Sequence, residues 1–151
     1  MDILKADQND LTEILKLQYL AYQSEARLIN NFNIPPLRQT LDEVTQEYLG
    51  GTVLKAVDAN GSIVGSVRAY SSGGTLYIGK LIVRPDLQGQ GIGTRLLSEI
   101  ESTSPHMRYE LFTGSKSISN ISFYQKRSYT IYAEKAVSPD LTLVYMEKYH
   151  K

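Results

Sequence analysis

The sequence predicts an α/β (α+β) fold in which about seven strands form one mixed sheet flanked by four helices. Three observations lead to this prediction. Apolar residues alternate with period two in some segments and recur every three or four residues in others. The strand and helix patterns follow the order β α α β β β α β α β β, with short connections between them. A glycine-rich turn joins one of the apolar strands to the helix that follows it.

The first half of the chain predicts a strand, two helices and an antiparallel set of strands. Helical spacing of apolar residues identifies a long helix at residues 10–29. A capping box at Thr40 and Glu43 begins the second helix, because each of these residues can accept a hydrogen bond from the backbone of the other. An Asn-Gly pair at residues 60–61 is typical of a hairpin turn. The expected strands are residues 2–6, 52–58, 62–71 and a strand that ends at Val83.

The second half predicts a third helix after the glycine-rich turn, and then strands and a helix in alternation. Apolar residues at helical spacing place the third helix within residues 88–104, and residues 117–127 form the expected fourth helix. The remaining expected strands are residues 107–113, 130–136 and 141–148. The sequence shows no repeat, low-complexity tract or linker, so we expect a single domain over residues 1–151.

The composition indicates a globular protein that binds neither nucleic acid nor a membrane. Sixteen Lys and Arg residues balance sixteen Asp and Glu residues, which leaves no basic excess for an anionic partner. No apolar run approaches the roughly 20 residues of a membrane span, and the N-terminal residues lack the pattern of a signal peptide. Because the chain has no cysteine and its histidines lack neighbours at ligand spacing, we expect no bound metal and a cytoplasmic location.

The stretch from Leu81 to Thr94 carries the clearest functional pattern. Apolar residues end a buried strand, Pro85 cannot donate to further strand pairing, and glycines alternate before a helix. Glycines let a backbone approach a ligand closely, and the first N–H groups of a helix have no partner within it. Such groups, at the positive end of the helix dipole, suit a phosphate or pyrophosphate. The glycine spacing matches neither the Rossmann fingerprint nor the P-loop.

The pattern Gln-x-x-Gly-x-Gly at Gln88, Gly91 and Gly93 resembles the acetyl-coenzyme A signature of the GNAT family of N-acetyltransferases. The order of elements is similar to that family's fold over essentially the whole chain. The resemblance implies an acyl-CoA N-acyltransferase fold, whose sheet is splayed at its centre between the strand ending at Val83 and the strand 107–113. It implies acetyl-CoA as co-substrate, with the pantetheine arm on Leu81, Ile82 and Val83 and the pyrophosphate on Gln88, Gly89, Gln90, Gly91, Ile92, Gly93 and Thr94.

The segment from Asn120 to Tyr129 resembles a second motif of the same family. Asn120 and Tyr124 are four residues apart, so they share one face of a helix. The resemblance implies that Asn120 binds the coenzyme arm and that Tyr124 places its hydroxyl near the thioester sulfur. The sequence departs from the motif at Ser128, where the family has glycine, and a left-handed conformation there would strain a serine mildly.

The resemblance implies transfer of the acetyl group to a primary amine of a small molecule or peptide, and the absence of a marked nucleophile favours direct transfer over an acyl-enzyme. Tyr124 can act as the general acid, since a tyrosine pKa near 10 lies close to a thiol pKa near 8.5. A backbone N–H near Val83 is the candidate oxyanion donor. Many relatives carry a Glu on the central strand as general base, but residues 75–83 contain no carboxylate. We expect Glu25, with Tyr22, to recognise or deprotonate the amine; a solvated surface carboxylate is the alternative for Glu25.

Two other functions are consistent with the sequence. A non-catalytic acyl-CoA-binding module would keep the glycine-rich turn without the acid and base; Tyr124 argues against this alternative, and the missing strand carboxylate leaves it open. An unrelated nucleotide-binding domain would bind ATP or NAD and not coenzyme A. The acceptor amine has no signature in the sequence. The resemblance also implies that the chain could form a homodimer, although no segment identifies an interface.

Overall fold

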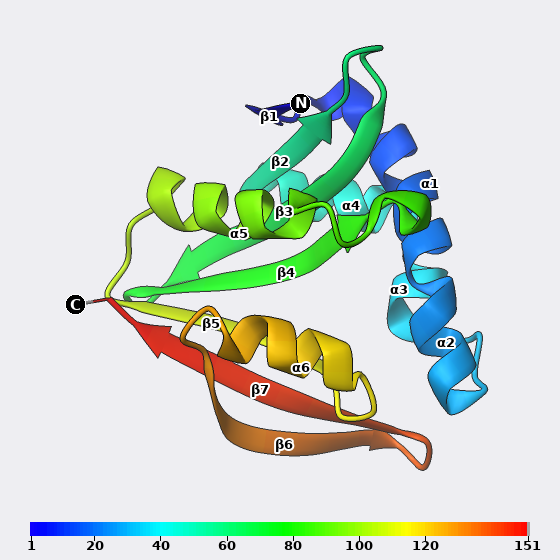
Figure 1. Cartoon of the computed structure of the whole chain (residues 1–151), viewed down its shortest axis with the longest axis vertical. Coiled ribbons are helices and arrows are strands. Elements are labelled where there is room, and N and C mark those ends of the chain that lie inside the picture. Colours follow the sequence, from blue (N-terminus) through cyan, green and yellow to red (C-terminus); the bar gives the residue numbers. More distant parts are fainter. Residues whose placement is uncertain (151) are drawn as a thin grey trace.

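Figure 1 shows the computed structural model, which describes residues 1–150. The strands are β1 (Asp2–Lys5), β2 (Thr52–Val57), β3 (Ile63–Ser72), β4 (Thr75–Val83), β5 (Arg108–Gly114), β6 (Thr130–Ser138) and β7 (Leu141–Tyr149). They form one seven-stranded sheet in the order β1-β2-β3-β4-β5-β7-β6. All neighbouring strands are antiparallel except β4 and β5, which run parallel. The predicted mixed sheet is therefore confirmed.

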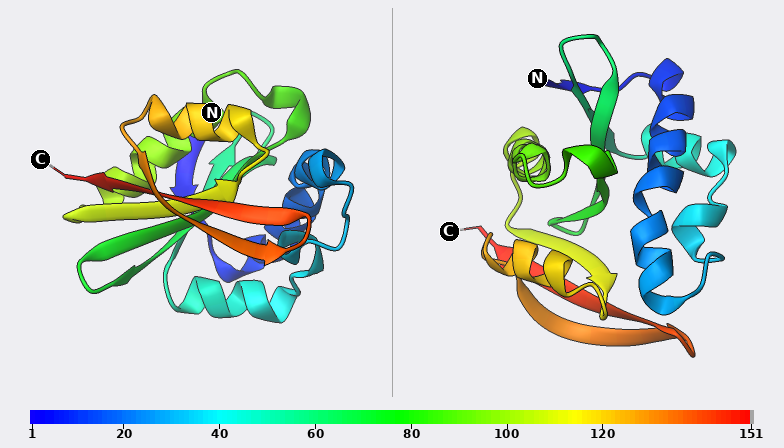
Figure 2. Two further views of the ribbon diagram at one scale, coloured as in Figure 1. Left: turned by 90° about the horizontal axis from the view of Figure 1, so that it is seen from below. Right: turned by 45° about the vertical axis from the view of Figure 1, so that its right-hand side comes forward.

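Helices cover both faces of the sheet, as the two views of Figure 2 show. They are α1 (Leu11–Ala21), α2 (Gln23–Ile29), α3 (Pro35–Arg38), α4 (Leu41–Leu49), α5 (Ile92–Thr103) and α6 (Ile118–Gln125). Apolar residues of α1 and α4 pack with β2, β3 and β4 in one buried cluster. Residues of α5 and α6 pack against the other face in a second cluster, which extends from β2 to β7. Within residues 1–150, no helix is long and apolar enough to cross a membrane.

Two local features differ from the prediction. The expected helix at residues 10–29 is divided at Tyr22, whose φ of −82° and ψ of 0° separate α1 from α2. The short helix α3 lies between the two expected helices and was not predicted. It begins at Pro35, a position where proline is tolerated because the first N–H groups of a helix have no partner within it. The predicted capping box is present, since the N–H of Glu43 donates to Thr40 Oγ1 (3.2 Å) and the N–H of Thr40 donates to Glu43 Oε1 (2.9 Å).

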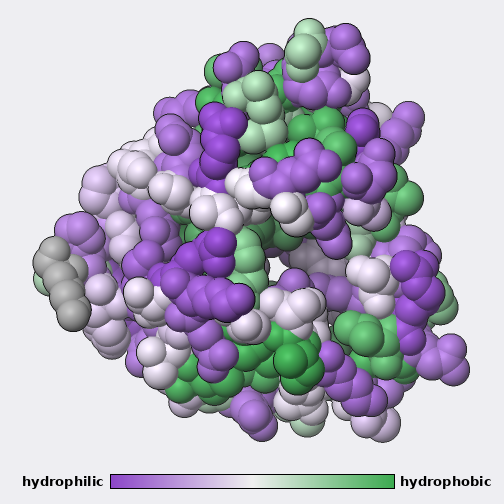
Figure 3. All heavy atoms as spheres, in the orientation of Figure 1, coloured by the Kyte–Doolittle hydropathy of each residue, from purple (hydrophilic) through white to green (hydrophobic). Residues whose placement is uncertain are grey.

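The central strands β4 and β5 pair only near their N-terminal ends. Their register pairs are Thr75 with Arg108, Leu76 with Tyr109 and Tyr77 with Glu110. Beyond these pairs β5 continues beside β7, and β4 continues beside β3. The predicted central splay is thus confirmed. Figure 3 shows that the surface is hollowed where the two halves of the sheet separate; we call this hollow the wedge.

A β-bulge in β4 accompanies the separation. Ser66 pairs with Ile82 and Arg68 pairs with Gly79, so one residue of β3 lies opposite both Lys80 and Leu81. Lys80 has a φ of 50°, which is uncommon for a residue with a side chain. Bulges bend a strand and increase its twist. The bulge therefore turns β4 away from β5 directly after the paired section.

Candidate functional site

The turn between β4 and α5 has the backbone conformation that an anion site requires. Gly89 and Gly91 have φ values of 80° and 84°, which glycine adopts far more readily than other residues. Gly91 is the N-cap of α5, and no side chain caps this helix. The first backbone N–H to bond back is that of Arg95, which donates to Gly91 O (3.1 Å). The N–H groups of the first three residues of α5 are therefore available to a ligand.

The third glycine of the motif serves a different purpose. A Cβ atom placed on Gly93 would lie 3.5 Å from Phe123 Cζ and 3.7 Å from Val83 Cγ2. The first turn of α5 thus packs closely against α6 and the end of β4. By contrast, a Cβ atom on Gly89 or Gly91 would meet nothing within 4 Å. At these two positions the backbone conformation requires glycine, and the space around the turn is open.

The segment Leu81, Ile82 and Val83 borders the wedge. Ile82 is buried in the cluster below α1, whereas Leu81 and Val83 pack against the cluster below α5. Since pairing with β5 ends at Tyr77, the backbone of this segment has no strand partner on its β5 side. Its N–H and C=O groups on that side can bind an extended ligand.

Tyr124 of α6 lies buried, with 8% of its surface exposed. Its ring contacts those of Phe123 and Tyr129 edge to face, with centroids 5.3 and 6.0 Å away. Burial raises the pKa of Tyr124, and the charge of Glu25 raises it further. Tyr124 is therefore protonated at neutral pH and has a proton to donate.

Asn120 joins Glu25 to the sheet. Its Nδ2 donates to Glu25 Oε1 (2.8 Å) and to Thr113 Oγ1 (3.3 Å). One amide thus connects α2, α6 and β5. Burial raises the pKa of Glu25, and the hydrogen bond from Asn120 partly opposes this effect. The alternative of a solvated surface carboxylate therefore does not describe Glu25. Binding of the coenzyme arm by Asn120 stays a prediction.

Tyr22 and Tyr124 approach Glu25 from opposite faces of the sheet. Tyr22 packs with the cluster of α1 and α4, whereas Tyr124 belongs to the cluster of α5 and α6. Burial raises the pKa of Tyr22 well above its ordinary value, and the charge of Glu25 adds to the shift. The structure thus brings Tyr124 close to Glu25 and Tyr22, the pair that the sequence analysis selected for the amine.

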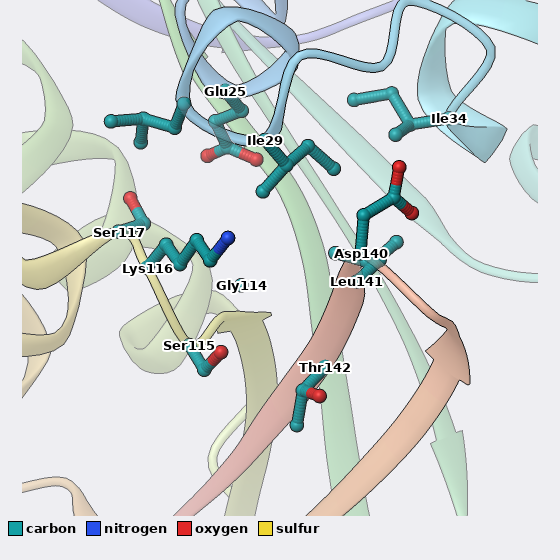
Figure 4. A pocket seen from close by; sticks show the side chains of 11 residues that line it. Glu25, Ile29, Ile34, Gly114, Ser115, Lys116, Ser117, Asp140, Leu141 and Thr142 are labelled. Atoms are coloured by element: carbon teal, nitrogen blue, oxygen red, sulfur yellow. The ribbon is translucent and has the colours of Figure 1, made fainter.

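A pocket opens beside Glu25 (Figure 4); about 340 Å³ of empty space, open solvent included, lies between its lining residues. Its lining residues are Glu25, Leu28, Ile29, Ile34, Gly114, Ser115, Lys116, Ser117, Asp140, Leu141 and Thr142. The side chains of Glu25 and Lys116 lie on one side of the pocket and that of Asp140 on the other. Asp140 Oδ1 accepts from Ser138 Oγ (2.6 Å) and from Asn31 Nδ2 (3.4 Å). The hydrogen bond from Ser138 is the main cause of a lowered pKa for Asp140, which is therefore ionised.

Sequence reasoning missed a buried polar cluster between α1, α4 and β3. Arg68 is 5% exposed, and it donates to Glu47 Oε1 (3.1 Å) and to Gln18 Oε1 (2.5 Å). Lys80 lies nearby, and burial lowers its pKa although the charge of Glu47 opposes the shift. The cluster fastens α1 and α4 to the sheet beside Tyr22. Its residues lie in separate segments with no shared motif, so no local signal could have identified them.

Comparisons with known proteins bear on the family and the fold of the chain. A family model described as the acetyltransferase (GNAT) family matches residues 9–129. A search of curated proteins found no match.

Solved structures of acetyltransferases share the fold over almost the whole chain. A GNAT-family acetyltransferase from Staphylococcus aureus Mu50 is 19% identical, with a TM-score of 0.79 and 99% of both chains covered. The PaiA N-acetyltransferase from Thermoplasma acidophilum, in complex with coenzyme A, is 15% identical, with a TM-score of 0.80 over 99% of this chain and 98% of that one. An aminoglycoside 6'-N-acetyltransferase complexed with coenzyme A is 19% identical, with a TM-score of 0.75 over 99% and 97% of the two chains. The family model covers most of the sequence, and the chain belongs to the GNAT family of acetyltransferases.

Proposed function

We propose that the protein is an acetyl-CoA-dependent N-acetyltransferase that transfers the acetyl group directly to a primary amine of a small molecule or peptide. The observation that carries this proposal is the convergence of Tyr124 and Glu25 beside the wedge, a buried phenol next to a carboxylate of raised pKa. Perturbed groups of this kind mark catalytic sites. Family membership and the two coenzyme A complexes of similar fold support acyl transfer.

The coenzyme occupies the α5 side of the wedge in this proposal. The pantetheine arm lies along Leu81, Ile82 and Val83, whose backbone lacks a partner on the β5 side. The pyrophosphate binds at the uncapped start of α5, where free N–H groups and the helix dipole favour an anion. The residues of this turn are Gln88, Gly89, Gln90, Gly91, Ile92, Gly93 and Thr94. The thioester then lies towards Tyr124.

Glu25 accepts the proton of the acceptor amine. A lysine-like amine with a pKa near 10.4 is only about 10⁻³ to 10⁻⁴ free base at pH 7, which corresponds to about 4 to 5 kcal/mol. A carboxylate whose pKa is raised by burial is a stronger base than a solvated one, and Glu25 lies where the pocket meets the wedge. The ammonium proton first passes through Glu25 to solvent, and the neutral nitrogen then attacks the thioester carbonyl while a backbone N–H near Val83 stabilises the oxyanion. The nitrogen of the tetrahedral intermediate gives its second proton to Glu25.

Tyr124 protonates the sulfur as the C–S bond breaks. Burial raises the pKa of Tyr124 and the negative charge of Glu25 raises it further, which makes the phenol a poor acid in the resting site. When Glu25 takes the second proton of the nitrogen, this charge disappears and Tyr124 becomes a better acid. Tyr124 is therefore a stronger acid when the thiolate leaves than it is before the amine is deprotonated. Return of the proton from Glu25 to the tyrosinate completes the cycle.

The acceptor occupies the pocket of Figure 4. Its amine faces Glu25, and the apolar side chains of Ile29, Ile34 and Leu141 contact its carbon skeleton. The ionised carboxylate of Asp140 at the far side of the pocket attracts a cationic acceptor. Burial and then the nearby charge of Glu25 raise the pKa of Tyr22, so its hydroxyl is protonated beside the carboxylate. In this proposal Tyr22 contributes to recognition of the amine.

The test is incubation with acetyl-CoA and a panel of primary amines, with detection of free thiol and mass spectrometry of the products. We expect thiol release in equal amount to one N-acetylated amine, and no acetyl group on the protein when the amine is omitted. Binding of coenzyme A without thiol release from any amine would instead favour a non-catalytic acyl-CoA-binding module. Binding of ATP or NAD in place of coenzyme A would contradict both functions.

A further inference from the structure

Arg127 brings a positive charge to the start of α5. Its Nη2 donates to Thr94 Oγ1 (2.5 Å) in the first turn of that helix, and its Nη1 donates to Phe123 O (2.8 Å). The guanidinium carbon lies 3.8 Å from the centre of the Phe123 ring, which is a stacked arrangement. These partners are all neutral.

The end of α6 holds Arg127 in this place. The N–H of Arg127 donates to Tyr124 O (2.9 Å), and the N–H of Tyr129 donates to the same oxygen (3.1 Å). Ser128 has a φ of 75°, the left-handed conformation expected at this position. The turn thus fixes the backbone of Arg127 independently of α5. The side chain is directed to the first turn of α5 by Phe123 and Thr94.

Within residues 1–150 no carboxylate forms a salt bridge with Arg127. Its Nε is buried without a hydrogen-bond acceptor. The nearby start of α5 carries the positive end of the helix dipole, so a cation there is unfavourable unless an anion is present. Thr94 Oγ1 accepts from Arg127, which leaves the hydroxyl proton of Thr94 free to donate. The guanidinium, this hydroxyl and the free N–H groups of α5 are together suited to one anion.

We propose that Arg127 binds the coenzyme pyrophosphate together with Thr94, as a charged side chain in a site otherwise made of backbone N–H groups. The proposal rests on the proposed function, because the anion is that of the co-substrate. The sequence motifs assign this site to residues 88–94 alone. Arg127 follows α6 and reaches the site only through the packing of α6 against α5.

The test compares the binding of coenzyme A with that of pantetheine, which lacks the phosphates, by calorimetry and NMR titration. Arg127→Met keeps an unbranched apolar chain against Phe123 and removes the charge. We expect it to weaken coenzyme A about tenfold and to change pantetheine less than about twofold, because one charge-assisted contact is lost. Arg127→Lys keeps the charge without the planar fork, so we expect an intermediate loss. The matched control is Lys126→Met, which removes an exposed cation from the neighbouring position.

Three outcomes separate the proposals. Equal weakening of both ligands by Arg127→Met would show that Arg127 only holds α6 against α5, and unchanged coenzyme A binding would also overturn the assignment. Failure of the unmodified protein to bind coenzyme A would overturn the proposed function and this assignment together. Should Arg127→Met not fold, Arg127→Lys and Thr94→Val provide the same comparison, and each is expected to weaken coenzyme A alone.

Discussion

The two sides of the wedge are built from different chemical groups. The proposed coenzyme side consists largely of backbone N–H groups within residues 81–94, shaped by a bulge and by glycines of positive φ. The proposed acceptor side consists of side chains from α2, from the loop after β5 and from the start of β7. A site made of backbone needs a local pattern of residues, whereas a site made of side chains needs distant segments to meet. The first can therefore be recognised from sequence, and the second requires the fold.

Tyr124 lies at the boundary between the two sides, and its removal should have the largest effect. Tyr124→Phe removes the proton donor, so we expect turnover to fall about 10²- to 10³-fold while coenzyme A affinity changes less than about twofold. Steady-state kinetics and calorimetry give the two values. Tyr129→Phe is the control, because this buried tyrosine bonds Glu101 instead and should leave turnover nearly unchanged. A parallel loss of affinity and turnover in Tyr124→Phe would assign Tyr124 to coenzyme binding alone.

Glu25→Gln tests the proposed general base, which lies where the pocket meets the wedge. We expect kcat/KM for a lysine-like amine to fall about 10- to 100-fold, with a smaller loss for amines of lower pKa. In the unmodified protein activity should rise with pH through the raised pKa of Glu25, and the variant should lack this rise. The exposed Glu13→Gln is the control. An unchanged pH profile in Glu25→Gln would exclude Glu25 as the base.

The same raised pKa predicts an effect on stability. Because the folded state binds the proton of Glu25 more tightly than the unfolded state does, this residue destabilises the protein as pH rises above the ordinary carboxyl pKa near 4.3. Glu25→Gln should therefore melt at a higher temperature than the unmodified protein at pH 7, with the difference vanishing near pH 4. Calorimetric melting curves at the two pH values measure it.

Gly91→Ala tests the coenzyme side, and Gly61→Ala, in the turn between β2 and β3, is its matched control. Both glycines have a positive φ, 84° and 81°, and a Cβ atom at either would meet nothing within 4 Å. Each substitution should lower the free energy of unfolding by about 1 to 2 kcal/mol. Only Gly91→Ala should also weaken coenzyme A, by about tenfold. Equal affinities in the two variants would place the pyrophosphate elsewhere.

Asp140→Asn should give the smallest effect. It neutralises the carboxylate at the far side of the pocket and keeps a group that can accept from Ser138. We expect the KM of a cationic acceptor to rise about three- to tenfold, with kcat and coenzyme A affinity unchanged. Measurements at several salt concentrations should show the difference shrinking as the charge is screened. A change in coenzyme A affinity would contradict the separation of the two sides.

The difference between the two sides also explains what the sequence could predict. The order of the strands, the capping box at Thr40 and the left-handed turn at Ser128 follow from local patterns, and the structure confirms them. The break at Tyr22 could not be predicted, because no proline or glycine lies there and the apolar spacing continues across it. The bond from Asn120 to Glu25 joins residues far apart in the chain, and only the packing of α2 beside α6 creates it.

The three pairs that join β4 to β5 have a further consequence. Unpaired strand edges usually attract strands of other molecules and lead to aggregation. In this sheet the outermost strands are β1 and β6, and the unpaired stretch of β4 lies between β3 and β5 in the interior of the strand order. This unpaired edge is therefore open to a small ligand in the wedge, but it does not lie at the rim of the sheet, where a strand of another protein could pair with it.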